Sequence, residues 1–174
     1  DGIVSPQRPT AADVIGSRIW YAAGYFAPCN NIVYFKKDVL RIGPKAKAKD
    51  HLGRKKKLTW DDVNKVLRKG FRLKGGLIRA SASQFVPGRP IGPYRYEGTR
   101  GDDPNDVIPH QDRRELRAMR LLSAWINHVD SREQNTLDVW TKRGGRTYLT
   151  HYKIDWGDGL GARWPRQAFT RRMG

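Results

Sequence analysis

Cysteine, acidic residues and long apolar runs are all scarce in this chain of 174 residues. The single cysteine, Cys29, excludes a disulfide framework and a thiolate metal cluster, and such sparing use is typical of a reducing compartment. We therefore expect a cytoplasmic protein. No apolar stretch approaches the ~20 residues that a membrane-spanning helix needs, so the sequence predicts no transmembrane segment.

Basic residues outnumber acidic ones, with 34 Lys and Arg against 17 Asp and Glu, which gives a net charge of +17. The excess is concentrated, because segment 41–57 holds eight basic residues and one acid, and segment 163–172 holds four and none. The rest of the chain holds 22 basic and 16 acidic residues, a net charge of only +6. This clustering indicates that the two segments contact a polyanion, either RNA or an acidic lipid surface. A merely solvated charge run is the alternative.

Hydrophobic patterning predicts an α+β domain, in which helices and short strands follow one another without an internal repeat. Helices are expected over residues 11–23, 60–69 and 109–127. Strands are expected over residues 31–37, 39–42, 77–85, 94–96, 136–140 and 147–154. Thr59 is expected to cap the second helix, and the Gly144-Gly145 pair predicts a tight hairpin between the last two strands.

The pattern divides the chain into five segments. They are a helix with two strands over 1–42, a basic mobile loop over 43–58, a helix, a strand and loops over 59–108, the chemistry-bearing segment 109–162, and a basic tail over 163–174.

Residues suited to phosphoryl transfer gather where the last predicted helix ends. Asp130 and Asn135 lie in the loop between that helix and an apolar strand, and Asp155 with Gly157 closes the next strand. Phosphoryl transfer needs a carboxylate to orient the attacking hydroxyl and hard oxygen ligands to hold Mg²⁺. Turn formation explains each residue taken alone. The joint spacing favours a site in which Asp130 is catalytic and Asn135 and Asp155 bind metal.

This arrangement resembles the catalytic core of the protein-kinase-like superfamily. Protein kinases carry a catalytic Asp, four residues and a metal-binding Asn, and later an Asp-Phe-Gly triplet. Asp130 and Asn135 keep that interval, and Asp155-Trp-Gly stands in the place of the triplet. Residues 154–161 (Ile-Asp-Trp-Gly-Asp-Gly-Leu-Gly) are closer still to the Ile-Asp-Phe-Gly-His-x-Leu-Gly phrase of phosphoinositide kinases and related atypical kinases. The neighbouring residues also resemble a group of uncharacterised bacterial proteins.

The resemblance implies a Mg²⁺-dependent ATP phosphotransferase acting on an unknown hydroxyl acceptor. By analogy, Asp13 on the first helix takes the acidic, cofactor-binding role that is usually played by Glu. Arg132 is a candidate to contact the phosphates of ATP, and a solvated loop arginine is the alternative.

Three departures from the kinase pattern limit the resemblance. No Gly-rich loop precedes the first helix, and the strand that carries the phosphate-pairing lysine would lie before Asp1. The chain also stops soon after the triplet, where a kinase large lobe continues with several helices. We therefore expect residues 1–174 to be a fragment of a kinase-like fold that is inactive on its own, and a degenerate kinase-like domain is the alternative. The alternative from another class is a non-catalytic, strongly basic binding or assembly subunit that contacts RNA or a larger complex.

Overall fold

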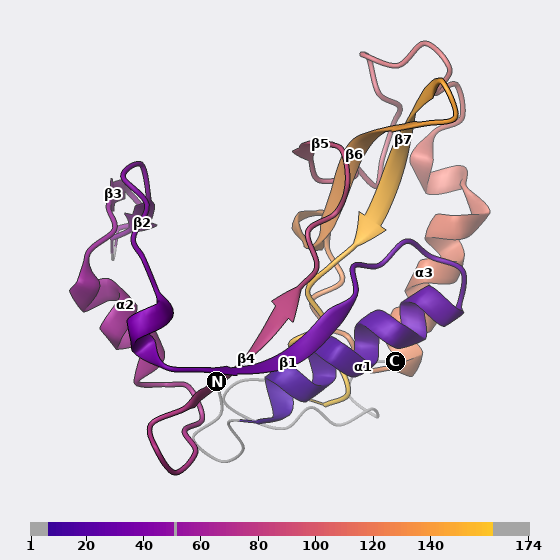
Figure 1. Cartoon of the computed structure of the whole chain (residues 1–174). Helices are drawn as coiled ribbons and strands as arrows, with labels where there is room; N and C mark the ends of the chain where they lie inside the picture. The colour runs from indigo at the N-terminus through magenta and orange to yellow at the C-terminus, as the bar shows by residue number, and fades with distance from the viewer. Residues whose placement is uncertain (1–6, 51, 162–174) are drawn as a thin grey trace.

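The computed structural model describes residues 7–50 and 52–161, which fold into three α-helices and three small antiparallel sheets. The helices are α1 (Arg8–Ala22), α2 (Trp60–Leu67) and α3 (Arg114–Trp125). The paired strands are β1 (Asn30–Phe35) with β4 (Ile78–Ser83), β2 (Lys47–Lys49) with β3 (Lys55–Lys57), and β5 (Arg89–Gly92) with β6 (Thr136–Arg143) and β7 (Arg146–Lys153). This mixture confirms the α+β class (Figure 1). None of the helices in these ranges is both long and apolar enough to cross a membrane.

The hairpin of β6 and β7 forms as the sequence predicts and extends further than expected. Its strands pair antiparallel from Thr136 opposite Lys153 to Arg143 opposite Arg146. Gly144 and Gly145 make the turn with φ values of 57° and 74°, a conformation that glycine adopts without steric cost. The hairpin therefore delivers the residues that follow β7 to the place where β6 begins.

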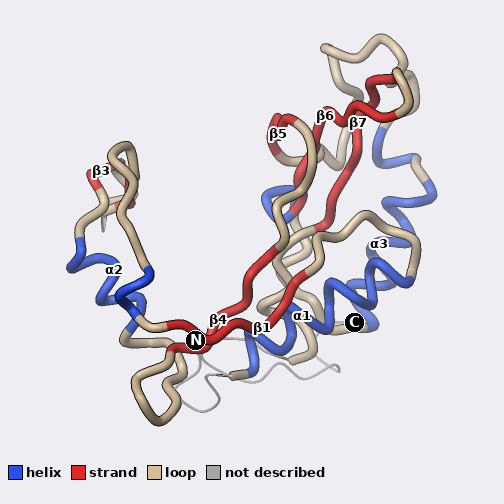
Figure 2. The backbone as a smooth tube through the Cα atoms, in the orientation of Figure 1, coloured by secondary structure: helices blue, strands red, loops and turns tan. Residues whose placement is uncertain are grey.

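Residues 36–77, which we call the basic arm, are inserted between β1 and β4. The two strands pair directly up to Phe35 opposite Ile78, so everything between them leaves the sheet and returns to it. Figure 2 shows α2 and the β2–β3 hairpin standing apart from α1 and the three-stranded sheet. Thr59 caps α2 as predicted. Its hydroxyl accepts a hydrogen bond from the Asp62 amide, and the Asp62 carboxylate accepts one from the Thr59 amide. Segment 43–58, expected as a basic mobile loop, contains the short β2–β3 hairpin, and its mobility stays a prediction.

Helix α1 packs against the segment that follows β7. Its buried residues recur at helical spacing, and Trp20 and Trp156 are both fully buried in the main core. Gly16 lies directly under Trp156, because a Cβ at Gly16 would stand 2.5 Å from the Trp156 Cβ. Only glycine lets the helix approach this closely, so residue 16 sets the distance between α1 and the Asp155-Trp-Gly segment.

Three expected elements differ in the structure. Residues 39–42 and 94–96 are not strands; a 3₁₀ turn covers Lys37–Val39, and Tyr94 packs in the core. The missed strand β5 is an edge strand with a bulge at Pro90, the kind of position where proline is tolerated in a sheet. Helix α3 begins only at Arg114, because residues 110–112 form a separate 3₁₀ turn in which His110 is buried. The tail 163–174 lies outside the described residues.

Candidate functional site

Asp130 and Asn135 are joined directly in the loop between α3 and β6. The Asn135 Nδ2 donates to the Asp130 backbone carbonyl at 2.6 Å and to its carboxylate at 3.0 Å. Both partners are acceptors, so the nitrogen of the amide must face Asp130. The Asn135 Oδ1 takes no part in these bonds and is left as the group that can meet a cation.

Asp155 follows the end of β7, next to the start of β6. The amide of Ile154 donates to the Asn135 carbonyl at 3.0 Å, which continues the β6–β7 ladder by one step beyond the strands. Asp155 itself has a φ of 60°, which is uncommon for a residue other than glycine, and it is exposed. The chain thus turns sharply at Asp155 just after passing Asn135. That the side chains of Asn135 and Asp155 can share one Mg²⁺ stays a prediction.

Asp13 ties helix α1 to the segment that contains Asp155. It is buried, and its carboxylate accepts from Asn30 Nδ2 at 2.9 Å and from the Trp156 amide at 3.2 Å. Burial raises the pKa of Asp13, and the nearby carboxylate of Asp155 adds to the shift, while these hydrogen bonds act in the opposite direction. Both carboxylate oxygens are therefore engaged inside the protein. This geometry gives Asp13 a bridging position, and its cofactor-binding role stays a prediction.

Arg132 contacts the candidate catalytic residue. Its Nε lies 2.8 Å from one Asp130 oxygen and its Nη2 donates to the other at 3.1 Å, so the guanidinium grips the carboxylate with two nitrogens. The Arg132 side chain is 64% exposed. Arg132 therefore holds Asp130 in one orientation from the solvent side. Contact between Arg132 and a phosphate stays a prediction.

Lys153 is a site residue that the sequence reasoning missed. It is 2% exposed, and its Nζ donates to the Asn135 carbonyl at 3.0 Å. Burial lowers the pKa of Lys153 to about 8, while the carboxylates of Asp155 and Asp130 act in the opposite direction. Strand alternation puts this lysine on the same face of β7 as His151, which bonds the buried Asp138. That contact is visible only in the structure, so no sequence signal indicates the burial of Lys153.

His128 is buried beside the same groups. Burial lowers the pKa of His128 to about 4, and the Lys153 ammonium adds to the shift. The carboxylate of Asp130 and the backbone of Asp155 act in the opposite direction. Neither ring nitrogen forms a hydrogen bond of normal geometry with residues 7–50 and 52–161. A neutral, enclosed imidazole fits a packing role for His128, and it leaves Asp130 as the better candidate for a proton acceptor.

A second layer of charge braces the face of β6 and β7 that carries Lys153. Asp138 is fully buried and accepts from Arg100 Nη1 at 3.0 Å, and a nitrogen of His151 lies 2.6 Å from its other oxygen. Tyr94 packs against the His151 ring with the centroids 4.4 Å apart. These contacts join the two strands to each other and to the loop that carries Arg100.

Binding of Mg²⁺ by Asn135 and Asp155 stays a prediction. In the described parts of the chain, no group of three or more His, Cys, Asp or Glu residues could hold a metal ion. Mg²⁺ characteristically uses one or two protein oxygens and completes its shell with water and substrate phosphates. An amide oxygen and an exposed carboxylate fit that requirement.

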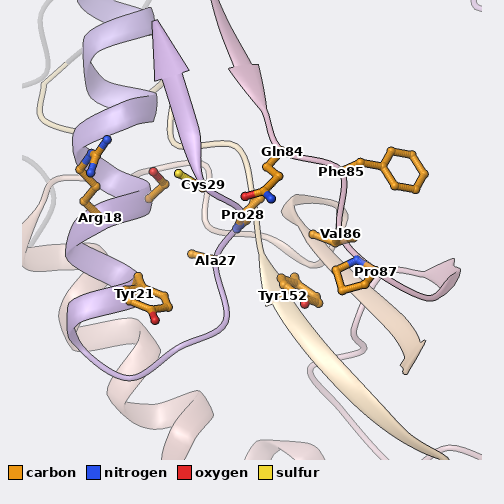
Figure 3. A pocket seen from close by; sticks show the side chains of 11 residues that line it. Arg18, Tyr21, Ala27, Pro28, Cys29, Gln84, Phe85, Val86, Pro87 and Tyr152 are labelled. Carbon is orange, nitrogen blue, oxygen red and sulfur yellow. The ribbon is translucent and has the colours of Figure 1, made fainter. Parts of the chain in front are cut away.

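A groove of about 540 Å³ lies on the other side of β7 (Figure 3). It runs between α1, the segment before β1 and the segment after β4, and Tyr152 from β7 lines it. Because side chains alternate along a strand, Tyr152 points to the opposite face from Lys153. The groove contains none of Asp130, Asn135 and Asp155, so it lies outside the candidate site.

Comparisons with known proteins add no family to this geometry. No protein-family model, curated protein or solved structure matches the chain.

Proposed function

We propose that this protein transfers the γ-phosphoryl group of ATP to a hydroxyl acceptor in a Mg²⁺-dependent reaction, on a kinase-like catalytic core. Asp130 serves as the catalytic carboxylate, and Asn135 with Asp155 holds the metal. A Mg²⁺ ion held by these residues would offset the negative charge that develops on the phosphates during transfer.

One observation supports this proposal above the others. The backbone bond from Ile154 to Asn135 brings two segments about twenty residues apart in sequence into register, so that Asp130, Asn135 and Asp155 come from one small region. The Asn135 amide is also held with its oxygen directed away from Asp130, as metal ligation requires.

The residues of the chain divide the reaction between them. Asp130 orients the acceptor hydroxyl and takes its proton as the acceptor oxygen bonds to the γ-phosphorus. The bond from that phosphorus to the β–γ bridging oxygen breaks, and ADP leaves with the electron pair. The Lys153 ammonium interacts electrostatically with the carboxylates of Asp130 and Asp155 and limits their mutual repulsion before ATP binds. Asp13 keeps Trp156, and with it Asp155, against helix α1.

A second candidate function is a non-catalytic binding or assembly subunit that contacts RNA or another polyanion. The observation that favours it is the basic arm, which carries 15 basic and four acidic residues, a net charge of +11 out of +17 for the chain. The basic tail 163–172 contributes to the same proposal. Binding of this kind weakens steeply as salt rises, whereas phosphoryl transfer requires Mg²⁺.

Calorimetric titration with ATP tests the first candidate without needing to know the acceptor. We expect ATP to bind in the presence of Mg²⁺ and Asp155→Asn to weaken that binding by at least about tenfold, because one negative ligand is lost from the metal. Without Mg²⁺, the wild type and the variant should bind ATP equally weakly.

The matched control is Asp102→Asn, which removes an exposed carboxylate that pairs with Arg100. It lowers the negative charge by the same amount and should leave binding unchanged. Equal Mg²⁺-dependent affinity in wild type and Asp155→Asn, or no binding of Mg²⁺ and ATP at all, would overturn the assignment of Asp155.

A further inference from the structure

The β2–β3 hairpin of the basic arm places four lysines on one face. The strands pair Lys47 with Lys57 and Lys49 with Lys55. Residues directly opposite each other, or two apart along a strand, project to the same side of a sheet. Lys47, Lys49, Lys55 and Lys57 therefore share one side, which we call the four-lysine face.

The positive charge of the four-lysine face is not neutralised by acidic side chains of the described residues. All four residues are exposed, and none forms an ion pair within the described parts of the chain. Opposite residues on paired strands have Cβ atoms about 5 Å apart, and like charges there are destabilising. The two facing lysine pairs therefore destabilise the β2–β3 hairpin, whose strands are only three residues long.

The other side of the hairpin is treated differently. Lys56 points away from the four-lysine face, and its Nζ lies 2.6 Å from an Asp62 oxygen at the start of α2. Near the turn, Arg54 pairs with Asp50 at 2.9 Å. Arg54 and Lys56 thus have acidic partners, whereas the four lysines have none within the described residues. Lysines also protect edge strands from pairing with other chains, but one or two suffice for that purpose.

We propose that the four-lysine face binds a nucleic-acid duplex along its phosphodiester backbone, without reading its sequence. A two-stranded ribbon is narrow enough to approach the major groove of a duplex, where phosphates border both of its edges. The face offers no aromatic side chain on which an unpaired base could stack, which disfavours a single strand. It offers no apolar side chain either, which disfavours insertion into a membrane surface. This inference gives the second candidate function a surface and a partner, and it does not depend on phosphoryl transfer.

Salt-dependent binding of a fluorescent DNA duplex of arbitrary sequence tests this site. Each lysine–phosphate contact contributes about 0.9 to the slope of log affinity against log salt concentration. We expect replacement of the four lysines by Gln to reduce that slope by about 3.6 and to weaken binding equally for unrelated duplex sequences.

The control variant replaces four exposed basic residues outside the basic arm by Gln, namely Arg120, Lys142, Arg143 and Arg146. It has the same net charge as the four-lysine variant and should bind like the wild type. Equal losses in the two variants would overturn the assignment, because binding would then depend on net charge alone. Duplex binding that persists in the four-lysine variant would place the contact elsewhere and leave only polyanion binding in general.

Two further outcomes also decide the partner. Vesicles of phosphatidylserine and phosphatidylcholine should not compete with the duplex for the protein. If they compete, and if their binding is lost in the four-lysine variant, the face recognises a lipid surface and the duplex proposal is overturned. If the wild type binds neither probe, both this inference and the second candidate function fail, while the titration with ATP is unaffected.

Discussion

Asp130→Asn is expected to lower the kcat for Mg²⁺-dependent phosphoryl transfer by about 10²- to 10⁴-fold in the intact protein, because proton transfer by a positioned side chain contributes an effect of that size. The substitution keeps an oxygen that can accept the bond from Asn135 Nδ2. The geometry of the loop should therefore survive while the proton acceptor is lost. Single-turnover measurement of phosphoryl transfer gives the rate.

The affinity for Mg²⁺ and ATP separates loss of chemistry from loss of the fold in this variant. That affinity should change little, since Asp130 is not assigned as a metal ligand. Asp102→Asn again serves as the control and should keep the wild-type rate. Undiminished turnover in Asp130→Asn would remove Asp130 from the catalytic role.

Acid should destabilise the protein between about pH 6.5 and pH 4 through His128. Burial holds the pKa of His128 near 4 in the folded protein, against 6.5 for the ordinary side chain. The unfolded chain therefore takes up a proton over this range and the folded chain does not, so the free energy of unfolding falls as the pH falls. The loss approaches about 1.4 kcal/mol per pH unit, and about 3 kcal/mol in all, and urea unfolding measures it.

His128→Asn provides the comparison that isolates this effect. Asparagine does not titrate, while every other group contributes equally to both proteins. The difference in unfolding free energy between wild type and His128→Asn should be constant above pH 7 and should shift in favour of the variant as the pH falls towards 4. A difference that stays constant over the whole range would contradict the burial of a neutral imidazole.

The parts of the fold that the sequence predicts well are those set by local rules. The Gly144-Gly145 turn fixes the β6–β7 hairpin, and Thr59 with Asp62 fixes the start of α2, because both signals lie within a few residues. Strand β5 is not predicted from the sequence, because its proline and glycines argue against a strand. They are tolerated here because β5 is an edge strand with a bulge. The β2–β3 hairpin is not predicted either, because mutual repulsion between its lysines argues against paired strands.

In the candidate site, too, the sequence predicts the features set by local spacing and misses those set by contacts between distant residues. Spacing in the sequence suffices to group Asp130 with Asn135 and to single out Asp155. It could not show that Asp13 would bond the Trp156 amide, because that contact joins residues far apart in the chain and depends on the close approach at Gly16. Lys153 escaped notice because a lysine at the end of a strand is usually exposed, and its burial is set by the packing around the hairpin.

The central claim is that Asn135 and Asp155 hold one metal ion for a nucleotide. A crystal structure of the protein with Mn²⁺ in place of Mg²⁺ and a non-hydrolysable ATP analogue tests it most directly, because anomalous scattering locates the metal. We expect a metal ion about 2.1 Å from both the Asn135 Oδ1 and an Asp155 carboxylate oxygen, with phosphate oxygens completing its shell. A metal and nucleotide bound elsewhere, or an Asp155 carboxylate turned to the opposite face of the hairpin from Asn135, would contradict it.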